Sequence, residues 1–84
     1  MTHQFSYTIT DPGGIHARPA GLLVRKAQEF PDEITLSKGE KTANLKKLLA
    51  VMGLGIRQGD TVTVTVEGEK QTADLLETFF REHL

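Results

Sequence analysis

One histidine stands in a setting that favours phosphoryl chemistry. His16 lies in the segment GGIHARPAG, residues 13–21, between a glycine pair and an Arg-Pro pair, whereas the other two histidines lie near the ends of the sequence. Because free histidine has a pKa of ~6.5, an imidazole offers a neutral ring nitrogen at neutral pH and can attack phosphorus. Arg18 adds a permanent cation whose planar set of donors suits a phosphate group. The segment therefore fits a histidine that accepts and releases a phosphoryl group.

A helix is expected to begin at this segment. Apolar residues with helical spacing predict a helix over residues 17–30, and Pro19 fits its first turn. The first backbone N–H groups of a helix have no partner inside it and form an anion site. Gly13 and Gly14 allow backbone angles that other residues avoid and allow close approach by a partner. A helix-capping histidine beside a surface arginine fits the same residues, so both interpretations stay open at this level.

The remaining patterns predict the order β-α-β-β-α-β-α. The expected strands are residues 4–10, 33–37, 41–43 and 61–66, and the other helices are 46–52 and 69–83. The clearest strand is 61–66, where valine alternates with threonine. Because each strand has one apolar face, a single sheet with helices on one side is the simplest arrangement.

Composition indicates a soluble globular protein. The 84 residues include 38% hydrophobic and 25% charged residues, which fits one domain spanning residues 1–84. No apolar run approaches the ~20 residues that cross a bilayer, and the first residues lack a signal-peptide pattern. The absence of cysteine excludes disulfides and suits a reducing compartment. We therefore expect a cytoplasmic protein without direct membrane insertion.

Two other functional classes find little support. A nucleic-acid-binding α/β sandwich needs exposed aromatic residues on its sheet and a net basic surface, whereas the net charge here is −1. A metal site needs clustered ligands, and only the terminal Met1-Thr2-His3 resembles one. We expect no nucleic acid, metal or cofactor as ligand, and we expect His3 and His83 to be exposed to solvent.

Positive charge is concentrated in the part of the sequence that contains His16. Residues 15–57 hold eight Lys and Arg against four Asp and Glu, a net charge of +4, whereas the remainder holds two against seven, a net charge of −5. These values sum to the overall −1. Such a region suits docking of an acidic partner or an anion. Ordinary scatter of charge over a solvated surface explains the asymmetry equally well.

Two segments resemble a known family. GIHARPA, residues 14–20, is similar to the active-site segment of the histidine-containing phosphocarrier (HPr) family of the bacterial phosphoenolpyruvate-dependent sugar phosphotransferase system. TANLKKLLAVMGLGIRQGD, residues 42–60, resembles the second-helix region of that family in length and apolar pattern. The resemblance implies an α+β fold of βαββαβα type, an open-faced sandwich in which three helices cover one face of a four-stranded antiparallel sheet.

The resemblance also implies a mechanism. Enzyme I would pass a phosphoryl group from phosphoenolpyruvate to Nδ1 of His16, and the carrier would pass it on to IIA domains of sugar permeases. Arg18 would stabilise the phosphate together with the backbone amides of Ala17 and Arg18. The protein would be a monomer and a phosphoryl carrier with a transient phosphohistidine, rather than a free-standing enzyme. A related carrier in a nitrogen-related or regulatory relay would carry the same histidine site.

Partner contacts are implied on the first two helices. The candidates are Ala20, Arg25, Lys47, Leu48, Leu49, Met52 and Leu54. Packing into the core explains the helical spacing of the apolar candidates equally well, so we expect about half of them to be buried. Arg25 is equally well explained as a solvated helix residue.

Lys47 departs from the pattern of the family. Many members carry a regulatory serine at the start of the second helix, where this sequence has Lys47. Lysine offers neither a hydroxyl to a kinase nor an acceptor to the helix N–H groups, so we expect no serine-kinase control here. Asn44 is a good capping residue, so the helix is expected to begin about a turn earlier than in serine-bearing relatives. Alternatively, the lysines are tolerated as part of a positive docking face. A solvated substitution with an effect of under ~0.5 kcal/mol explains Lys47 equally well.

Overall fold

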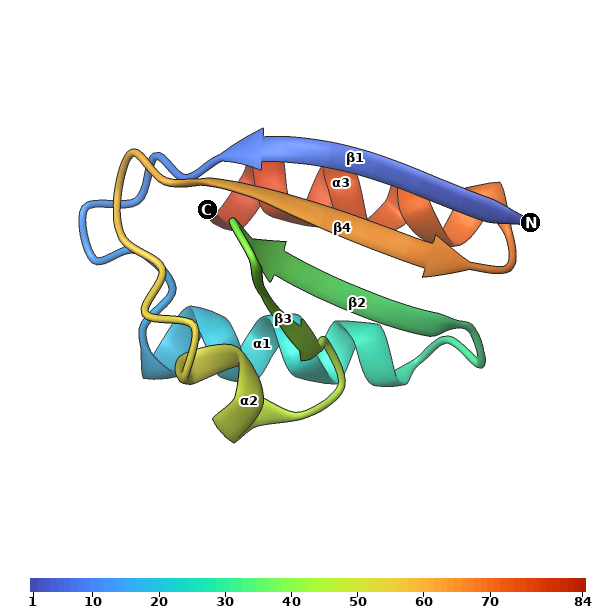
Figure 1. The fold of residues 1–84 in the computed structure, drawn as a ribbon, viewed down its shortest axis with the longest axis horizontal. Helices are drawn as coiled ribbons and strands as arrows, with labels where there is room; N and C mark the ends of the chain where they lie inside the picture. Colours follow the sequence, from blue (N-terminus) through green and yellow to red (C-terminus); the bar gives the residue numbers. More distant parts are fainter.

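The computed structural model describes residues 1–84 and confirms the open-faced sandwich. The strands are β1 (Thr2–Thr8), β2 (Glu33–Lys38), β3 (Lys41–Asn44) and β4 (Thr61–Glu67), and the helices are α1 (Ala17–Gln28), α2 (Leu48–Met52) and α3 (Lys70–His83). All neighbouring strands pair antiparallel in the order β1-β4-β2-β3 (Figure 1). None of the helices combines the length and the apolar content needed to cross a membrane.

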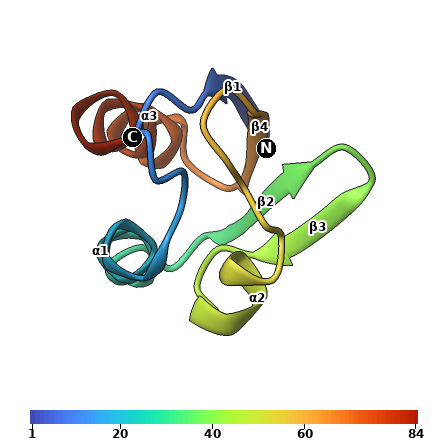
Figure 2. The ribbon, with the colours of Figure 1, turned by 90° about the vertical axis from the view of Figure 1, so that its left-hand side faces the viewer.

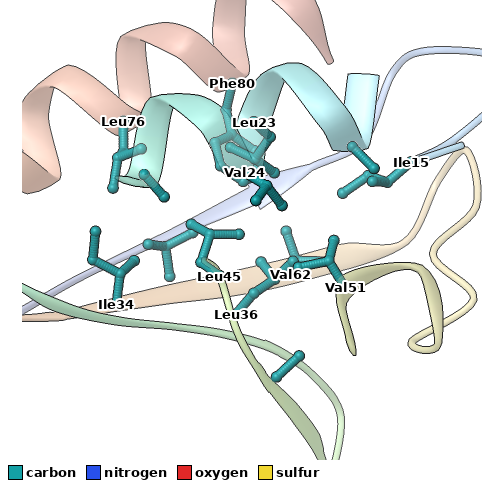
Figure 3. Packing of buried hydrophobic residues seen from close by; sticks show 14 of the residues in the cluster. Ile15, Leu23, Val24, Ile34, Leu36, Leu45, Val51, Val62, Leu76 and Phe80 are labelled. Atoms are coloured by element: carbon teal, nitrogen blue, oxygen red, sulfur yellow. The ribbon is translucent and has the colours of Figure 1, made fainter. Parts of the chain in front are cut away.

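The three helices lie on the same side of the sheet. Figure 2 shows α1 and α3 side by side over the strands, with α2 beneath β3 at the far edge. Alternation along β4 explains this arrangement, since Val62, Val64 and Val66 are buried while the intervening threonines stay accessible. These valines belong to the same buried cluster as Leu23 and Phe80 of the helices. Figure 3 shows Val62, Leu23 and Phe80 within this cluster. The opposite face of the sheet has no helix over it.

Several element boundaries differ from the sequence-based expectation. Strand β1 begins at Thr2 and ends at Thr8, so Ile9 enters the core after the strand has ended. The expected early start of the second helix is wrong, because α2 begins only at Leu48. Asn44 instead ends β3, and its Oδ1 accepts a hydrogen bond from the Lys46 N–H at 2.9 Å. This bond forms a turn before the helix rather than a helix cap.

A buried carboxylate from another loop caps the start of α3. Asp32, in the loop between α1 and β2, is only 8% exposed. Its Oδ2 accepts a hydrogen bond from the Glu69 N–H at 2.7 Å, and its Oδ1 accepts one from the Thr72 hydroxyl at 3.1 Å. These bonds, led by that from the Glu69 backbone, outweigh the opposing effect of burial and hold the pKa of Asp32 below its usual range. Gly68 leaves room for this carboxylate, since a Cβ there would lie 2.8 Å from Asp32 Cγ.

Candidate functional site

His16 is the N-cap residue of α1. Its backbone is extended, with φ −97° and ψ −177°, and its side chain forms no capping hydrogen bond. The His16 carbonyl accepts the first helical hydrogen bond, from the Ala20 N–H at 2.9 Å. The N–H groups of Ala17 and Arg18 precede this bond and have no carbonyl partner within the helix, and Pro19 has no N–H. The side chain of His16 is 51% exposed, so this helix start is open to solvent.

Gly14 fits the loop before His16 closely against another loop. Its φ is +65°, which favours glycine, and a Cβ at this position would lie 2.7 Å from Arg57 Cα. The Ile15 N–H donates to the Ile56 carbonyl at 3.1 Å, and Figure 1 shows the two loops side by side beyond one end of the sheet. The predicted reason for a glycine at 14, an unusual backbone angle, is therefore confirmed.

Gly13 makes room for the imidazole itself. A Cβ on Gly13 would lie 2.7 Å from Nε2 of His16, so the ring packs directly against the glycine backbone. The expectation for this residue was close approach by a partner molecule, whereas the group that approaches is the histidine of the same chain. The glycine pair thus serves two purposes, one in the loop backbone and one in the orientation of the ring.

Two residues, Asp60 and Leu84, hold the surrounding loops in place. Asp60 accepts a hydrogen bond from the Arg57 N–H at 2.8 Å and pairs with Lys38 at 2.9 Å. The Lys38 ammonium, with help from that backbone bond, holds the pKa of Asp60 below its usual range. On the other side, the Leu84 carbonyl accepts hydrogen bonds from the N–H groups of Thr10 and Asp11, at 2.7 and 2.9 Å. The loop that carries His16 is therefore anchored to the end of α3 (Figure 2).

His16 opens into a pocket of about 320 Å³ that is lined by six residues. They are Asp11, His16, Arg18, Pro19, Leu22 and His83. The structure thus brings the two predicted site residues, His16 and Arg18, together. It also adds Asp11, Leu22 and His83, which the sequence analysis did not select. His83 is exposed as expected, but it is part of this pocket and its ring lies 4.4 Å from that of Phe79, centroid to centroid.

The predicted partner-contact residues separate into two groups. Arg25, Lys47, Leu48, Leu49 and Met52 are exposed, and Leu49 is 83% exposed. Ala20 and Leu54 are 0% and 5% exposed, so the prediction is corrected for these two residues. Both belong to the hydrophobic core, where they present no side chain to a partner. His3 is also less accessible than expected, because it lies on the inner-facing side of β1 with Phe5 and Tyr7.

The pocket has the groups that reversible phosphorylation of a histidine requires. An exposed imidazole would supply the nucleophile, a guanidinium would supply fixed positive charge, and the N–H groups without a helical partner lie at the same helix start. Phosphoryl transfer depends mainly on positioning and charge stabilisation, which these groups provide. The pocket is open to solvent, and Arg18 is the only Arg or Lys that lines it. It therefore suits a phosphoryl group that must leave again.

Comparison with known proteins gives a consistent result. The family model described as "PTS HPr component phosphorylation site" matches residues 3–82. The phosphocarrier protein HPr of Lysinibacillus sphaericus is 53% identical over 70 residues, which cover 83% of this chain and 77% of the relative. The crystal structure of HPr from Bacillus anthracis superposes with a TM-score of 0.87 at 31% identity, covering 94% of this chain and 96% of that one.

A third relative forms a dimer. The crystal structure of Crh, a catabolite repression protein of Bacillus subtilis, has a TM-score of 0.75 at 29% identity and covers 93% and 92% of the two chains. It is described as a dimer with a swapping domain. Because relatives of this fold form dimers, the monomeric state of the present chain stays a prediction. Taken together, the fold, the histidine site and the match over residues 3–82 show that the chain belongs to the HPr phosphocarrier family of the phosphotransferase system.

Proposed function

We propose that this protein accepts a phosphoryl group from phospho-enzyme I on His16 and passes it to IIA domains of sugar permeases. The observation that carries the proposal is the position of His16, exposed at the open start of α1 in one pocket with Arg18. Nδ1 is the accepting atom, and Arg18 and the amides of Ala17 and Arg18 offset the charge of the phosphate. The donor and the acceptor are separate proteins, so the chain acts as a carrier between them.

The direct test is phosphorylation by enzyme I and phosphoenolpyruvate, followed by mass spectrometry. The wild type gains the mass of one phosphoryl group as an acid-labile adduct, and the adduct disappears when a IIA domain is added. His16→Ala gains none and remains folded, because an exposed N-cap residue without a capping bond contributes ~1 kcal/mol or less. His3→Gln is the matched control, since it removes a histidine from β1 far from the pocket. Phosphorylation of His16→Ala would overturn the proposal.

Docking of partners is proposed on the exposed faces of α1 and α2. Leu49 is the most exposed of the apolar residues there, and Arg25 on α1 and Lys47 at the start of α2 are exposed positive charges. We expect Leu49→Ser to weaken binding to enzyme I, measured by calorimetry, whereas the control Leu75→Ser on α3 leaves it unchanged. Binding also weakens as salt rises, because exposed charges are screened over ~10 Å at 0.1 M salt. Affinity that does not depend on salt would contradict electrostatic docking.

The choice of IIA partner decides the pathway. Exchange of the phosphoryl group with sugar-specific IIA domains supports the sugar relay. Exchange with a nitrogen-related IIA protein alone would retain the carrier role and assign the chain to the other relay. The histidine site is common to both, so purified IIA proteins of each kind are the appropriate probes.

A further inference from the structure

We propose that Asp11 is a positioning residue for phosphoryl transfer. Its carboxylate keeps the ring proton of His16 on Nε2, so that Nδ1 is free to take up and release the phosphoryl group. This inference rests on the proposed carrier function and deepens it, because it names the group that sets the tautomer of the histidine. It assigns to Asp11 no contact with the phosphoryl group itself.

Two contacts fix the carboxylate and the ring with respect to each other. Oδ1 of Asp11 accepts a hydrogen bond from the Gly13 N–H at 2.8 Å, so the loop backbone determines where the carboxylate lies. The same oxygen lies 4.0 Å from Nε2 of His16. The ring rests against Gly13, where a Cβ would come within 2.7 Å of Nε2. The Nε2 edge of the ring therefore faces Asp11, and Nδ1 projects from a different edge.

The electrostatic surroundings of Asp11 are simple. The ionisable groups that share the pocket with it are His16, Arg18 and His83. Among these only His16 comes within ion-pair distance of the Asp11 carboxylate. At 4.0 Å the carboxylate acts through its charge or through one bridging water, because a direct hydrogen bond needs a shorter distance. The carboxylate is 31% exposed and the imidazole 51% exposed, so solvent screens but does not abolish the attraction.

The position of the ring proton matters for both steps of the relay. In a neutral imidazole one nitrogen carries the proton and the other has a free lone pair, and the partner of the first nitrogen selects the tautomer. With the proton on Nε2, the Nδ1 lone pair attacks phosphorus while the bond from phosphorus to the donor atom breaks with its electron pair. The product ring carries Nδ1–P and Nε2–H together and bears a positive charge, which the Asp11 carboxylate stabilises.

The reverse step follows the same proton. The acceptor attacks phosphorus, the Nδ1–P bond breaks, and its electron pair returns to Nδ1, which leaves a neutral ring that still carries Nε2–H. No proton has to be transferred during the step. If Nε2 had lost its proton, the leaving group would be an imidazolate anion, which is a far poorer leaving group. A carboxylate beside Nε2 therefore favours release of the phosphoryl group as well as its uptake.

The test compares Asp11→Asn with the wild type. The amide oxygen can still accept the Gly13 hydrogen bond, but the negative charge is lost. We expect ¹⁵N NMR of the unphosphorylated protein at alkaline pH to show a smaller fraction of His16 with its proton on Nε2. Phosphoryl transfer to a IIA domain falls about twofold to fivefold, as expected for a partly exposed pair. Asp74→Asn is the matched control, because it removes an exposed carboxylate on α3 outside the pocket and changes neither readout.

The outcomes separate this inference from the proposed function. A wild type that takes up no phosphoryl group from enzyme I overturns the carrier function. A wild type that is phosphorylated, with an Asp11→Asn variant of unchanged tautomer fraction and unchanged transfer rate, overturns the role of Asp11 and leaves the carrier function intact. Should Asp11→Asn fail to fold, Gly13→Ala provides the second test, because its Cβ pushes the ring away from Asp11. The same loss of the Nε2–H tautomer is expected there, and its absence overturns the inference.

Discussion

Helices α1 and α3 begin in opposite ways, although neither N-cap side chain bonds to its own helix. At α3 a carboxylate from a distant loop, Asp32, accepts hydrogen bonds from the Glu69 N–H and the Thr72 hydroxyl and is buried there. At α1 no carboxylate accepts a hydrogen bond from the first N–H groups, because Asp11 faces the ring of His16 instead, and these groups stay open to solvent.

The difference shows how one structural feature serves two purposes. The start of any helix carries partial positive charge and attracts an anion. Where the chain supplies the anion itself, as with Asp32, the helix start contributes to stability and has no capacity left for a ligand. Where the chain supplies no anion, as at His16, the helix start is free to bind one, and the proposed phosphoryl group is such an anion. This comparison predicts that substitutions at the two positions affect different properties of the protein.

The largest effect is expected when α1 is made to resemble α3. Ala17→Asp places a carboxylate in the first turn, beside the site of the phosphoryl group. Phosphoryl transfer should fall roughly tenfold or more, because like charges about 4 Å apart repel by ~1 to 4 kcal/mol. Stability should stay unchanged or rise by ~0.3–1 kcal/mol, since the helix dipole favours an acidic residue there. Rapid-quench transfer assays and thermal melts measure both, with Ala17→Asn as the uncharged control. A normal transfer rate in Ala17→Asp would refute the comparison.

The converse change opens the start of α3. Asp32→Ala removes both acceptors, so the midpoint of thermal unfolding should fall by roughly 5 °C, as expected for loss of a helix cap in a chain of this size. Phosphoryl transfer by the folded fraction should not change, because Asp32 is not among the residues of the pocket. Asp74→Ala on the exposed side of α3 serves as the control. Equal melting temperatures for the two variants would show that the Asp32 bonds contribute nothing.

Acid should remove the advantage of the wild type over Asp32→Ala. The pKa of Asp32 is lowered in the folded state, chiefly by the Glu69 N–H, so its stabilising effect is fully present above the unfolded carboxyl pKa of ~3.9. The effect diminishes as the pH falls from there through the lower folded pKa. The pKa of Asp60 is also lowered, but Asp60 is present in both proteins, so its contribution cancels in the stability difference between them. Urea unfolding at pH 7, 5, 4 and 3 measures the difference in the free energy of unfolding between the wild type and Asp32→Ala. This difference should narrow below pH 4. A constant difference would contradict this assignment.

The smallest effect is expected at the start of α2. Lys47 is the N-cap residue and forms no capping bond, so Lys47→Ser should stabilise the protein by ~0.5–1 kcal/mol relative to Lys47→Ala in urea unfolding.

The wild type treated with the serine kinase of the family and ATP should remain unmodified over residues 44–54 in peptide mass mapping. Modification of that peptide, or failure of Lys47→Ser to become a kinase substrate, would show that Lys47 does not correspond to the regulatory serine.

Local patterns sufficed to predict most of the fold. The alternation of valine and threonine over residues 61–66 specified β4, because burial on one face of a strand depends only on residue spacing. The start of α1 followed from Pro19 and the apolar spacing of its buried face. The predicted start of α2 was wrong because the Asn44 side chain accepts a hydrogen bond from the Lys46 N–H in a turn, which competes with helix capping.

The site was only partly predictable, for reasons of distance along the chain. His16 and Arg18 belong to one short segment, so their association was visible in the sequence. His83 reaches the pocket only because α3 folds back to the first loop, and Asp32 caps a residue 37 positions away. The burial of a residue also depends on its neighbours in space, so the sequence could not show that Ala20 in α1 and Leu54 after α2, both expected at a contact surface, are buried.

The strand order has a consequence for how the protein acquires its function. Side-chain hydrogen bonds between β1 and β4 join positions 53 to 65 apart, so the first strand must wait for the last. Such pairing requires closure of a long loop, which costs chain entropy before the stabilising contacts form and therefore slows folding. On the ribosome, Gly14 and Ile15 likewise cannot pack against Ile56 and Arg57 until the second half has been synthesised. A nascent chain therefore contains His16 long before the pocket around this histidine, which includes His83, has formed.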